Sequence, residues 1–353
     1  MAEAAGDSGR SALRTGPAPS VPTTVPTAAV PTTAQTAAIV GADAAPRRRM
    51  GNSGLSVFPV ALSGKVFGWK ADDATTDAIL DGYAALGGNL IDTADSYSSG
   101  RSEVMIGNWM RSRRSRDATV VATKVGKGAD HPGAHAAAIT ASVEASLRRL
   151  RTDRIDLLFL HIDDPDVAFE ETLLAVDELI RAGKVLAFGA ADHTGNRIFE
   201  ARIASAQLGV APIEALQTPY NLMDRHDYEG DLENIVERVG VGVMPRFALA
   251  SGYLSGRYRT KADFAAAPRG AELASHLTRT GVKVLAALDE VAAAHDAALP
   301  TIALAWLLSK PNVVAPIVSA SSPEQVFDLV AAPHVRLTRH ELTQLDRASE
   351  PRR

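Results

Sequence analysis

Residues 119–161 read TVVATKVGKGADHPGAHAAAITASVEASLRRLRTDRIDLLFLH and combine two kinds of hydrophobic pattern. Short, partly β-branched apolar runs at 119–123 and 155–160 predict buried strands. Between them, residues 136–150 place apolar side chains at i, i+3 and i+4, which is the spacing of an amphipathic helix. A strand, a helix and a second strand in this order indicate two parallel strands joined by a helical crossover.

The same alternation extends along the chain from residue 46 to residue 353. Helical periodicity recurs at 74–86 and at 170–183, where Gly183 is suited to end a helix. Further strand-like runs lie at 57–62, 89–91, 185–188, 215–217, 242–244 and 313–317. Eight strand-helix units predict an α/β fold, namely a (β/α)8 TIM barrel over 46–353. A doubly wound sheet is the alternative, but no GxGxxG sequence follows the first strand.

The first 45 residues have a different composition, which predicts a disordered tail. Residues 16–45 are nearly all Ala, Pro, Thr and Val, and repeated proline opposes both helix and sheet. Early acidic residues and the lack of an apolar run after a basic start argue against a secretory signal, and less strongly against a transit peptide. We favour a tail without a catalytic role; a start site placed too early, ahead of Met50, is the other interpretation.

Composition excludes several classes of protein and site. The 353 residues contain no cysteine, so disulfides and cysteine-ligated metals are excluded, and no metal site is predicted. A net charge of −4 with mixed signs does not suggest a nucleic-acid partner. No run of 18 apolar residues predicts a membrane span. The expectation is a cytoplasmic protein that acts on a small molecule; its oligomeric state is left open.

Three consecutive predicted strands end on an ionisable residue, at Asp92, Lys124 and His161. Each has an ordinary interpretation when taken alone: a turn-capping carboxylate, a lysine that reaches solvent and a satisfied core histidine. In a barrel, however, the carboxyl ends of the strands surround one mouth, where the chemistry is placed. The three residues together therefore predict an active site.

Tyr97 follows in the Ser/Gly-rich loop that leaves Asp92, and it completes a plausible acid–base group. A phenol has a pKa of about 10 and is a poor acid at neutral pH. We expect the Lys124 ammonium to lower that pKa and Asp92 to hold the ammonium in place. A neutral His161 imidazole could donate a hydrogen bond to a substrate oxygen. Such a site protonates an oxygen while another group attacks the carbon.

At this point residues 46–350 are identified as similar to the aldo-keto reductase family. The matching segments include IDTADSY followed by GRSE, VVATKVG, SVEASLRRLRTDRIDLLFLH, ALQTPYNL, ALASGYLSGRY and SPEQV. The resemblance implies a (β/α)8 barrel, NADPH binding with NADH possible, and reduction of a carbonyl substrate. It implies a catalytic tetrad of Asp92, Tyr97, Lys124 and His161, with Tyr97 as the proton donor. KVFGW, HIDDPD and RYRTKADF resemble a bacterial branch of the family.

The resemblance also implies a set of cofactor and substrate positions, several of which depart from the family pattern. Asp192 stands where a contact to the carboxamide is usual, and Gln217 is its expected companion. Arg246 replaces a stacking aromatic residue, with Phe247 beside it as a possible substitute. Other implied cofactor positions are Leu249, Gly252, Arg257, Ser319, Ser321, Gln325 and Asp328. Trp69 is a candidate wall of the substrate pocket; for Trp69, Arg257 and Asp328, ordinary packing or solvation is the alternative.

The positions near the last strand carry hydroxyls and an amide, where the family carries Lys or Arg for a 2′-phosphate. Ser319, Ser321 and Gln325 are uncharged, which predicts a reduced preference for NADPH over NADH. The first functional hypothesis is an NAD(P)H-dependent reductase of an aldehyde or ketone, in specialised metabolism, with a keto-sugar or polyketide carbonyl as substrate. The second is a nicotinamide-binding sensor or regulatory barrel. The third is a non-reductive acid–base enzyme, such as a dehydratase or epimerase.

Overall fold

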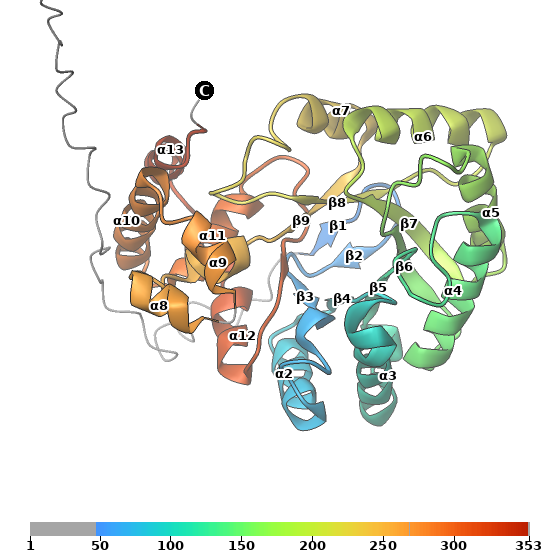
Figure 1. The fold of residues 1–353 in the computed structure, drawn as a ribbon, viewed down its shortest axis with the longest axis horizontal. Coiled ribbons are helices and arrows are strands. Elements are labelled where there is room, and N and C mark those ends of the chain that lie inside the picture. The colour runs from blue at the N-terminus through green and yellow to red at the C-terminus, as the bar shows by residue number, and fades with distance from the viewer. Residues whose placement is uncertain (1–46, 268, 352–353) are drawn as a thin grey trace, which may run out of the picture.

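The computed structural model describes residues 47–267 and 269–351. Eight parallel strands form one sheet in the order β10-β3-β4-β5-β6-β7-β8-β9, and helices surround it (Figure 1). The strands are β3 (Ala61–Ser63), β4 (Leu90–Asp92), β5 (Val120–Val125), β6 (Ile155–Leu160), β7 (Val185–Ala191), β8 (Ala215–Pro219), β9 (Gly242–Arg246) and β10 (Ile317–Val318). The predicted tail at 1–45 lies outside the described residues.

The sheet closes into a barrel through the segment that precedes β10. The Val243 amide in β9 donates to the Asn312 carbonyl at 2.8 Å, and the Val314 amide donates to the Val243 carbonyl at 2.8 Å. On the other side, the Ala61 amide in β3 donates to the Pro316 carbonyl at 2.9 Å. One short segment thus joins β9 to β3, which confirms the predicted (β/α)8 barrel over the doubly wound alternative.

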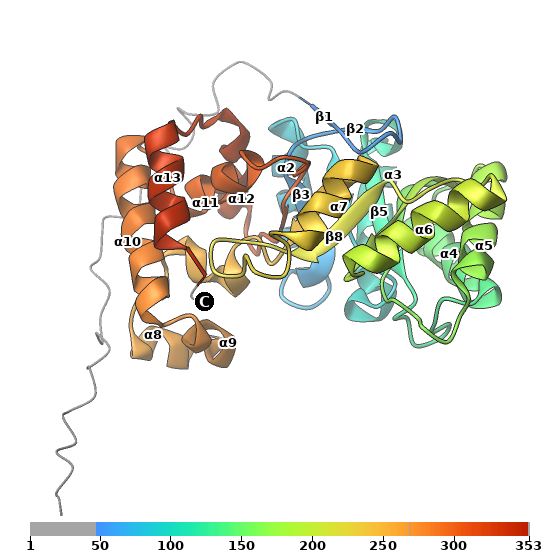
Figure 2. The ribbon, with the colours of Figure 1, turned by 90° about the horizontal axis from the view of Figure 1, so that it is seen from above.

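The helices cover the outside of the barrel. They are α2 (Asp73–Ala85), α3 (Arg101–Arg113), α4 (Ala136–Leu150), α5 (Phe169–Arg181), α6 (Gly195–Leu208), α7 (Asp231–Val239), α8 (Lys261–Ala266), α9 (Gly270–Ser275), α10 (Arg279–Ala294), α11 (Leu299–Leu308), α12 (Pro323–Val330) and α13 (Arg339–Ala348). The helices α8 to α11 lie in the long connection between β9 and β10, and α10 of this connection lies beside α13 (Figures 1 and 2).

An antiparallel hairpin precedes the barrel and corrects one sequence-based expectation. Its strands are β1 (Arg48–Arg49) and β2 (Ser56–Val57). We predicted a single first strand at 57–62, but Val57 pairs with Arg48 in the hairpin, whereas Ala61 pairs with Ile317 in the barrel. An unbroken apolar run cannot reveal where a chain changes its strand partner. Its first half is buried by pairing in the hairpin and its second half by pairing in the barrel.

The barrel interior is packed with apolar side chains that are small on some strands and large on others. Phe159 lies inside opposite Gly189, where an added Cβ would approach the Phe159 ring to 2.6 Å. Met50 and Val57 of the hairpin belong to this same inner cluster and are fully buried, so the hairpin covers one end of the barrel. Catalytic groups are therefore expected at the opposite end, where the strands finish.

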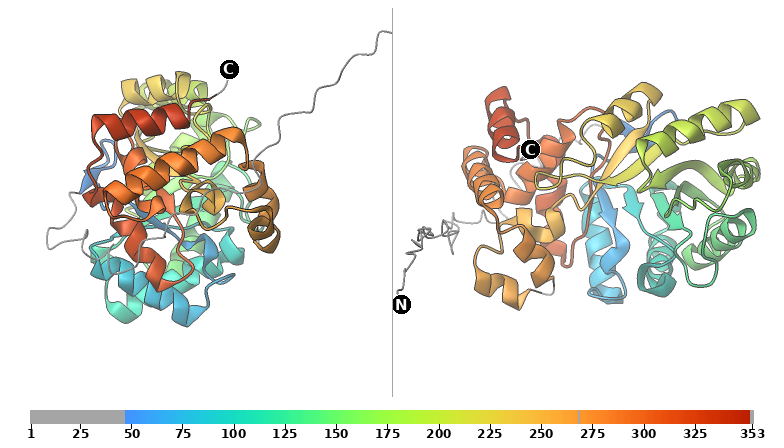
Figure 3. Two further views of the ribbon diagram at one scale, coloured as in Figure 1. Left: turned by 90° about the vertical axis from the view of Figure 1, so that its left-hand side faces the viewer. Right: turned by 45° about the horizontal axis from the view of Figure 1, so that its top comes forward.

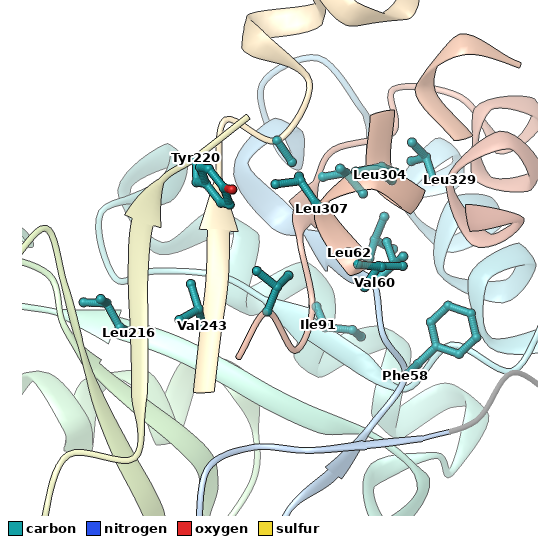
Figure 4. Close-up of a cluster of buried hydrophobic side chains, with 14 of the residues drawn as sticks. Phe58, Val60, Leu62, Ile91, Leu216, Tyr220, Val243, Leu304, Leu307 and Leu329 are labelled. Atoms are coloured by element: carbon teal, nitrogen blue, oxygen red, sulfur yellow. The ribbon is translucent and has the colours of Figure 1, made fainter. Parts of the chain in front are cut away.

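A second apolar layer joins the strands to the helices outside them. The strand residues Leu62, Ile91 and Val243 are buried in this layer (Figure 4). The helices α11 and α12 supply Leu304, Leu307 and Leu329 to the same layer (Figure 4). The helix α11 is buried along its whole length, which explains its uninterrupted apolar sequence. The views in Figure 3 show the helices of the last third of the chain gathered at one side of the barrel.

No single helix within 47–267 and 269–351 is long and apolar enough to cross a membrane. The helices α10 and α11 would satisfy the length and composition requirement only as a pair, and they meet at an angle of 95°.

Candidate active site

The structure brings Asp92, Lys124 and Gln217 together at the carboxyl ends of β4, β5 and β8. Lys124 Nζ donates to both carboxylate oxygens of Asp92, at 2.7 Å each, and to the Thr93 carbonyl at 2.7 Å. Gln217 Nε2 donates to Asp92 Oδ1 at 2.7 Å. Asp92, Lys124 and Gln217 are almost completely excluded from solvent. Asp92 therefore binds the buried ammonium and is itself held by an amide.

The Lys124 ammonium stays charged despite its burial. Burial lowers the pKa of Lys124, but the Asp92 carboxylate and the Tyr97 phenol raise it by more, so the net pKa lies above the ordinary value. A buried charge is stable only when it is paired and hydrogen-bonded, and the three acceptors of Lys124 provide this.

The Ser/Gly-rich loop after β4 turns the chain so that Tyr97 faces the strand ends. Ser98 and Ser99 have φ angles of 49° and 56°, and Gly100 has a φ of 83°, so three successive residues are left-handed. Such conformations favour small residues. Ser98 Oγ also donates to the Phe67 carbonyl at 2.9 Å, which anchors this loop to the connection after β3. The loop composition thus positions Tyr97.

Tyr97 lies next to both Lys124 and His161. Lys124 Nζ lies 4.9 Å from the centre of the Tyr97 ring, and the ring centres of Tyr97 and His161 are 6.3 Å apart with an edge-to-face geometry. The Lys124 ammonium lowers the pKa of the phenol, as we predicted, but the net pKa in the protein alone lies above the ordinary value. Burial raises the pKa of Tyr97, and the opposing effect of the Lys124 ammonium does not overcome it. The sequence does not reveal how deeply the hydroxyl is buried.

His161 follows β6 directly and is neutral. Burial lowers its pKa to about 2, and the nearby cations Lys124, Lys127, Arg246 and Lys65 act in the same direction. Its Nδ1 atom is buried without a hydrogen-bond partner. A neutral imidazole keeps one N–H donor and one acceptor at the mouth of the barrel.

A cavity of about 230 Å³ opens beside Asp92 and Tyr97. It contains several of the cofactor positions implied by the sequence, and these line it together with residues of β3, β9 and β10: Arg246, Phe247, Leu249, Gly252, Ser319 and Ser321. The lining also contains residues that sequence reasoning missed: Ser63, Lys65, Val66, Lys70, Ala248, Ser251, Tyr258, Arg269, Leu273, Ile317 and Val318.

The missed basic residues change the electrostatic character of the cavity. Lys65 lies two residues after the end of β3, so its place near a strand end was a signal that could have found it. Arg269 immediately precedes α9, and the sequence around it carries no comparable signal. Together with Lys70 and Arg246 these side chains make the lining cationic. We predicted an uncharged phosphate-binding site from the last strand and the loop after it alone.

Asp192 and Arg246 form an ion pair at the mouth. Asp192 was expected to accept a hydrogen bond from the carboxamide, and here its carboxylate is already paired. Arg246 also lies over Phe247, with its guanidinium carbon 5.0 Å from the ring centre. Arg246 Nε is buried without a partner. The two residues proposed as alternatives for stacking are therefore in contact with one another.

Besides Asp192 and Gln217, four implied positions lie outside the cavity lining. Arg257 is exposed, and Trp69 is 59% exposed with Lys70 Nζ 4.6 Å from its ring centre. Gln325 accepts hydrogen bonds from the amide and the hydroxyl of Ser321, at 2.9 and 3.3 Å, and so shapes the loop before α12. Asp328 lies on α12, where its carbonyl accepts a hydrogen bond from Thr301. Within the described residues, no group of three or more His, Asp or Glu could hold a metal ion.

Comparison with known proteins gives consistent matches over most of the chain. A model of the Aldo/keto reductase family matches residues 61–350. Norsolorinic acid reductase of Aspergillus flavus is 30% identical over 316 residues, which cover 84% of this chain and 79% of that protein. Aldo-keto reductase ausK of Aspergillus calidoustus is 32% identical over 315 residues, covering 83% of this chain and 79% of that protein. Putative aryl-alcohol dehydrogenase AAD14 of Saccharomyces cerevisiae is 30% identical over 319 residues, covering 83% of this chain and 84% of that protein.

Proposed function

Because the chain belongs to the aldo/keto reductase family and is an NAD(P)H-dependent oxidoreductase, we propose that it reduces an aldehyde or ketone to an alcohol with Tyr97 as the proton donor. The observation that carries this proposal is the buried Asp92–Lys124 pair beside the Tyr97 ring. Burial of such a pair is costly, so its presence at the barrel mouth favours a site that needs a fixed cation at this point.

The residues at the mouth fit a nicotinamide dinucleotide. Gln217 Oε1 is buried without a hydrogen-bond partner and can accept one from a carboxamide amino group. The cationic lining of the neighbouring cavity suits a diphosphate, and Ser319 and Ser321 add hydroxyl groups. The bound nicotinamide supplies a hydride for the carbonyl carbon. We propose that these residues hold NADPH, with NADH as an alternative.

Each residue of the tetrad has a separate task in the proposed reaction. Tyr97 Oη gives its proton to the oxygen that develops negative charge as the carbonyl is reduced. Lys124 favours the resulting phenolate, and Asp92 keeps Lys124 charged and in position. Neutral His161 donates a hydrogen bond to the carbonyl oxygen and orients it. Gln217 holds Asp92 and so fixes the Lys124 ammonium indirectly.

The substrate belongs, in this proposal, to specialised metabolism. Two of the relatives are named for the compounds they act on, norsolorinic acid in one case and, in the putative dehydrogenase, an aryl alcohol. They favour a polyketide or aryl carbonyl over the keto-sugar that we also considered. The comparison proteins named above are fungal, so the resemblance to a bacterial branch carries no weight in this choice.

The test is titration of the protein with NADPH and NADH, followed by turnover with a panel of aryl aldehydes, aryl ketones and keto-sugars. A reductase binds cofactor and consumes it in proportion to the alcohol formed. Binding without turnover of any carbonyl would favour the sensor, and conversion of substrate without consumption of cofactor would favour the non-reductive enzyme. The variant Lys124→Met serves as the control, because it removes the ammonium but keeps an unbranched side chain.

A further inference from the structure

Asp95 is an acidic residue of the IDTADSY segment that the proposed reaction does not use. It lies in the loop after β4, between Asp92 and Tyr97, and only 7% of its surface is exposed. Neither the tetrad nor the lining of the cavity beside Tyr97 includes it. Because this loop carries Tyr97, a contact that fixes the loop also fixes the phenol.

Asp95 joins the loop after β4 to the end of β5 through both its backbone and its side chain. Its amide donates to the Lys124 carbonyl at 3.0 Å. Its Oδ2 atom accepts hydrogen bonds from the amides of Gly126 and Gly128, at 3.3 and 3.2 Å. Its Oδ1 atom is buried and makes no hydrogen bond with any described residue. Within the part of the chain that the structure describes, the carboxylate therefore binds only the segment that follows Lys124.

The segment after Lys124 is shaped for this carboxylate. Gly126 has a φ of 108°, which glycine adopts far more readily than other residues. Gly128 lies outside the left-handed region, so its φ angle does not require glycine. A Cβ added to Gly128, however, would lie 2.7 Å from Asp95 Oδ2. The missing side chain at Gly128 thus makes room for the carboxylate.

The same segment also contacts the residues that follow β6. The His161 amide donates to the Val125 carbonyl at 2.8 Å. A Cβ added to Gly126 would lie 3.4 Å from Ile162 Cγ1. Asp95 is thus bound to a segment that lies beside the strand end carrying His161.

We propose that Asp95 is a positioning residue that holds Tyr97 in place relative to Lys124. The inference rests on the proposed reductase function and adds to it a residue that acts through the proton donor rather than on the substrate. Loss of the two side-chain hydrogen bonds would let the loop after β4 shift relative to β5. A displacement of about 1 Å in a reacting group lowers a rate by as much as about 10²-fold.

The experiment measures reduction of 4-nitrobenzaldehyde with NADPH by the full-length chain and its variants. Asp95→Ala removes both side-chain hydrogen bonds, whereas Asp95→Asn keeps an oxygen that can accept them. Gly128→Ala keeps the carboxylate but pushes a methyl group against it. Combining Asp95→Ala with Gly128→Ala completes a double-mutant cycle.

Asp177→Ala is the matched control. Asp177 is 8% exposed, and its carboxylate accepts a hydrogen bond from the Ala211 amide at 3.1 Å. This contact joins α5 to the connection before β8, at the end of the barrel where the strands begin. The control therefore removes an equally buried carboxylate that holds a backbone amide away from the tetrad.

We expect kcat to fall about 10- to 100-fold in Asp95→Ala. The Kd of NADPH should stay nearly unchanged, because Asp95 is not part of the cavity lining. Asp95→Asn should keep most of the wild-type kcat, and Asp177→Ala should lose stability but not turnover. Gly128→Ala should lower kcat in the wild-type background and have little further effect in Asp95→Ala, since the two residues act through one contact.

The proposal is overturned by a near-normal kcat in Asp95→Ala, by an equal loss in Asp95→Asn and Asp95→Ala, or by additive losses in the double variant. If Asp95→Ala does not fold, Gly128→Ala decides. A lowered kcat with an unchanged Kd for NADPH then supports the positioning role, and a normal kcat overturns it.

Failure of the reductase function would be recognised separately, because the place of Tyr97 can be measured without turnover. Tyrosines are labelled with ¹³C at Cζ, and the Tyr97 signal in the NMR spectrum is the one absent from Tyr97→Phe. This signal should move in Asp95→Ala and in Gly128→Ala, and should stay in place in Asp95→Asn and Asp177→Ala. An unmoved Tyr97 signal in Asp95→Ala overturns the positioning role, whether or not the wild type reduces the aldehyde.

Discussion

At the scale of single residues, Asp92 is the acceptor that organises the site. It receives hydrogen bonds from Lys124 and Gln217, which come from two strands that are not neighbours in the barrel. The tetrad residues are therefore held by contacts with one another as well as by the backbone. Substitution of one residue changes the charge or position of the others. Binding and turnover are therefore measured separately for each single variant.

Replacing Tyr97 by Phe removes the hydroxyl and keeps the ring that packs against His161. We expect turnover to fall by about 10²- to 10⁴-fold, since a positioned acid contributes that much. Cofactor affinity should change little. Stopped-flow measurement of cofactor oxidation and a fluorescence titration of cofactor binding check the two expectations. A near-normal rate in this variant would exclude Tyr97 as the proton donor.

His161 gives a prediction for stability against pH. Its pKa is lowered by burial to about 2 in the folded protein, whereas an unfolded histidine titrates near its ordinary value of about 6.5. As pH falls below about 6.5 the unfolded chain takes up a proton that the folded protein does not, so this residue's contribution to stability is lost on acidification. The expected loss is about 2 kcal/mol between pH 7 and pH 5.

The measurement is urea unfolding of wild type and His161→Asn at pH 7, 6 and 5. The variant should lose less stability over this range than the wild type does. His226→Asn is the matched control, because the His226 side chain is 91% exposed. Parallel pH profiles for wild type and His161→Asn would mean that His161 is protonated in the folded protein.

Ser321 tests the cofactor preference. Its hydroxyl and amide bind Gln325 in this structure, and the residues of this loop that were assigned to the phosphate are uncharged. We expect Ser321→Arg to tighten NADPH by about tenfold or more through a charge-assisted bond and to leave NADH nearly unchanged. Two binding isotherms per protein check this. A wild-type preference for NADPH of a thousandfold would instead assign the phosphate to Lys70 or Arg269 of the same cavity.

At the scale of elements, Glu103 connects three pieces of the barrel beside the tetrad. It lies on α3, is completely buried, and accepts a hydrogen bond at 2.6 Å from Thr123 of β5 and another at 2.6 Å from Arg149 of α4. Thr123 precedes Lys124, so this contact also supports the strand that carries the buried ammonium. These buried contacts explain why the GRSE segment carries an acidic residue, Glu103. The sequence pattern alone did not provide this explanation.

We expect Glu103→Gln to lower the free energy of unfolding by about 1.5–3 kcal/mol, the range for hydrogen bonds to charged groups. Gln keeps the shape and an acceptor but removes the charge that Arg149 needs. Asp117→Asn is the control: Asp117 also binds an arginine, Arg154, but it is 94% exposed and should contribute little. Urea unfolding of both variants at neutral pH measures the difference; similar values for the two would contradict a special role of burial.

At the scale of the whole molecule, the hairpin that precedes the barrel is a structural part of it. Arg48 donates to the Val313 carbonyl at 2.6 Å and to the Leu308 carbonyl at 2.8 Å, next to the segment that closes the sheet. Met50 fills the covered end of the interior. Residues 46 onward are thus expected to be required for stability, and residues 1–45 are proposed to be dispensable.

Two truncations test this. A chain that begins at residue 46 should keep the wild-type unfolding free energy and turnover. A chain that begins at Met50 lacks β1 and both Arg48 hydrogen bonds, and it should lose about 2 kcal/mol or more. Arg48→Met in the full-length chain separates the two bonds from the loss of the strand. A large loss on removal of 1–45 alone would show that the tail contributes to the barrel.

Sequence by itself determined the alternation of elements, because periodicity is a local property. The helix at 136–150 was predicted to the residue, and the ends of three consecutive strands were enough to predict that Asp92, Lys124 and His161 share one mouth. Parallel strands finish at the same edge whatever their other contacts are. The resemblance then added the family, which the comparisons confirm.

Only the tertiary structure decided the split of the first strand, the raised pKa of Tyr97 and the charge of the cavity. Each depends on partners that are distant in sequence: Arg48 and Ile317 for the split, the surrounding barrel for the phenol, and Lys65 with Arg269 for the lining. Burial and charge are sums over all neighbours in space. A sequence specifies those neighbours only through the complete fold, and this is why its local patterns did not reveal them.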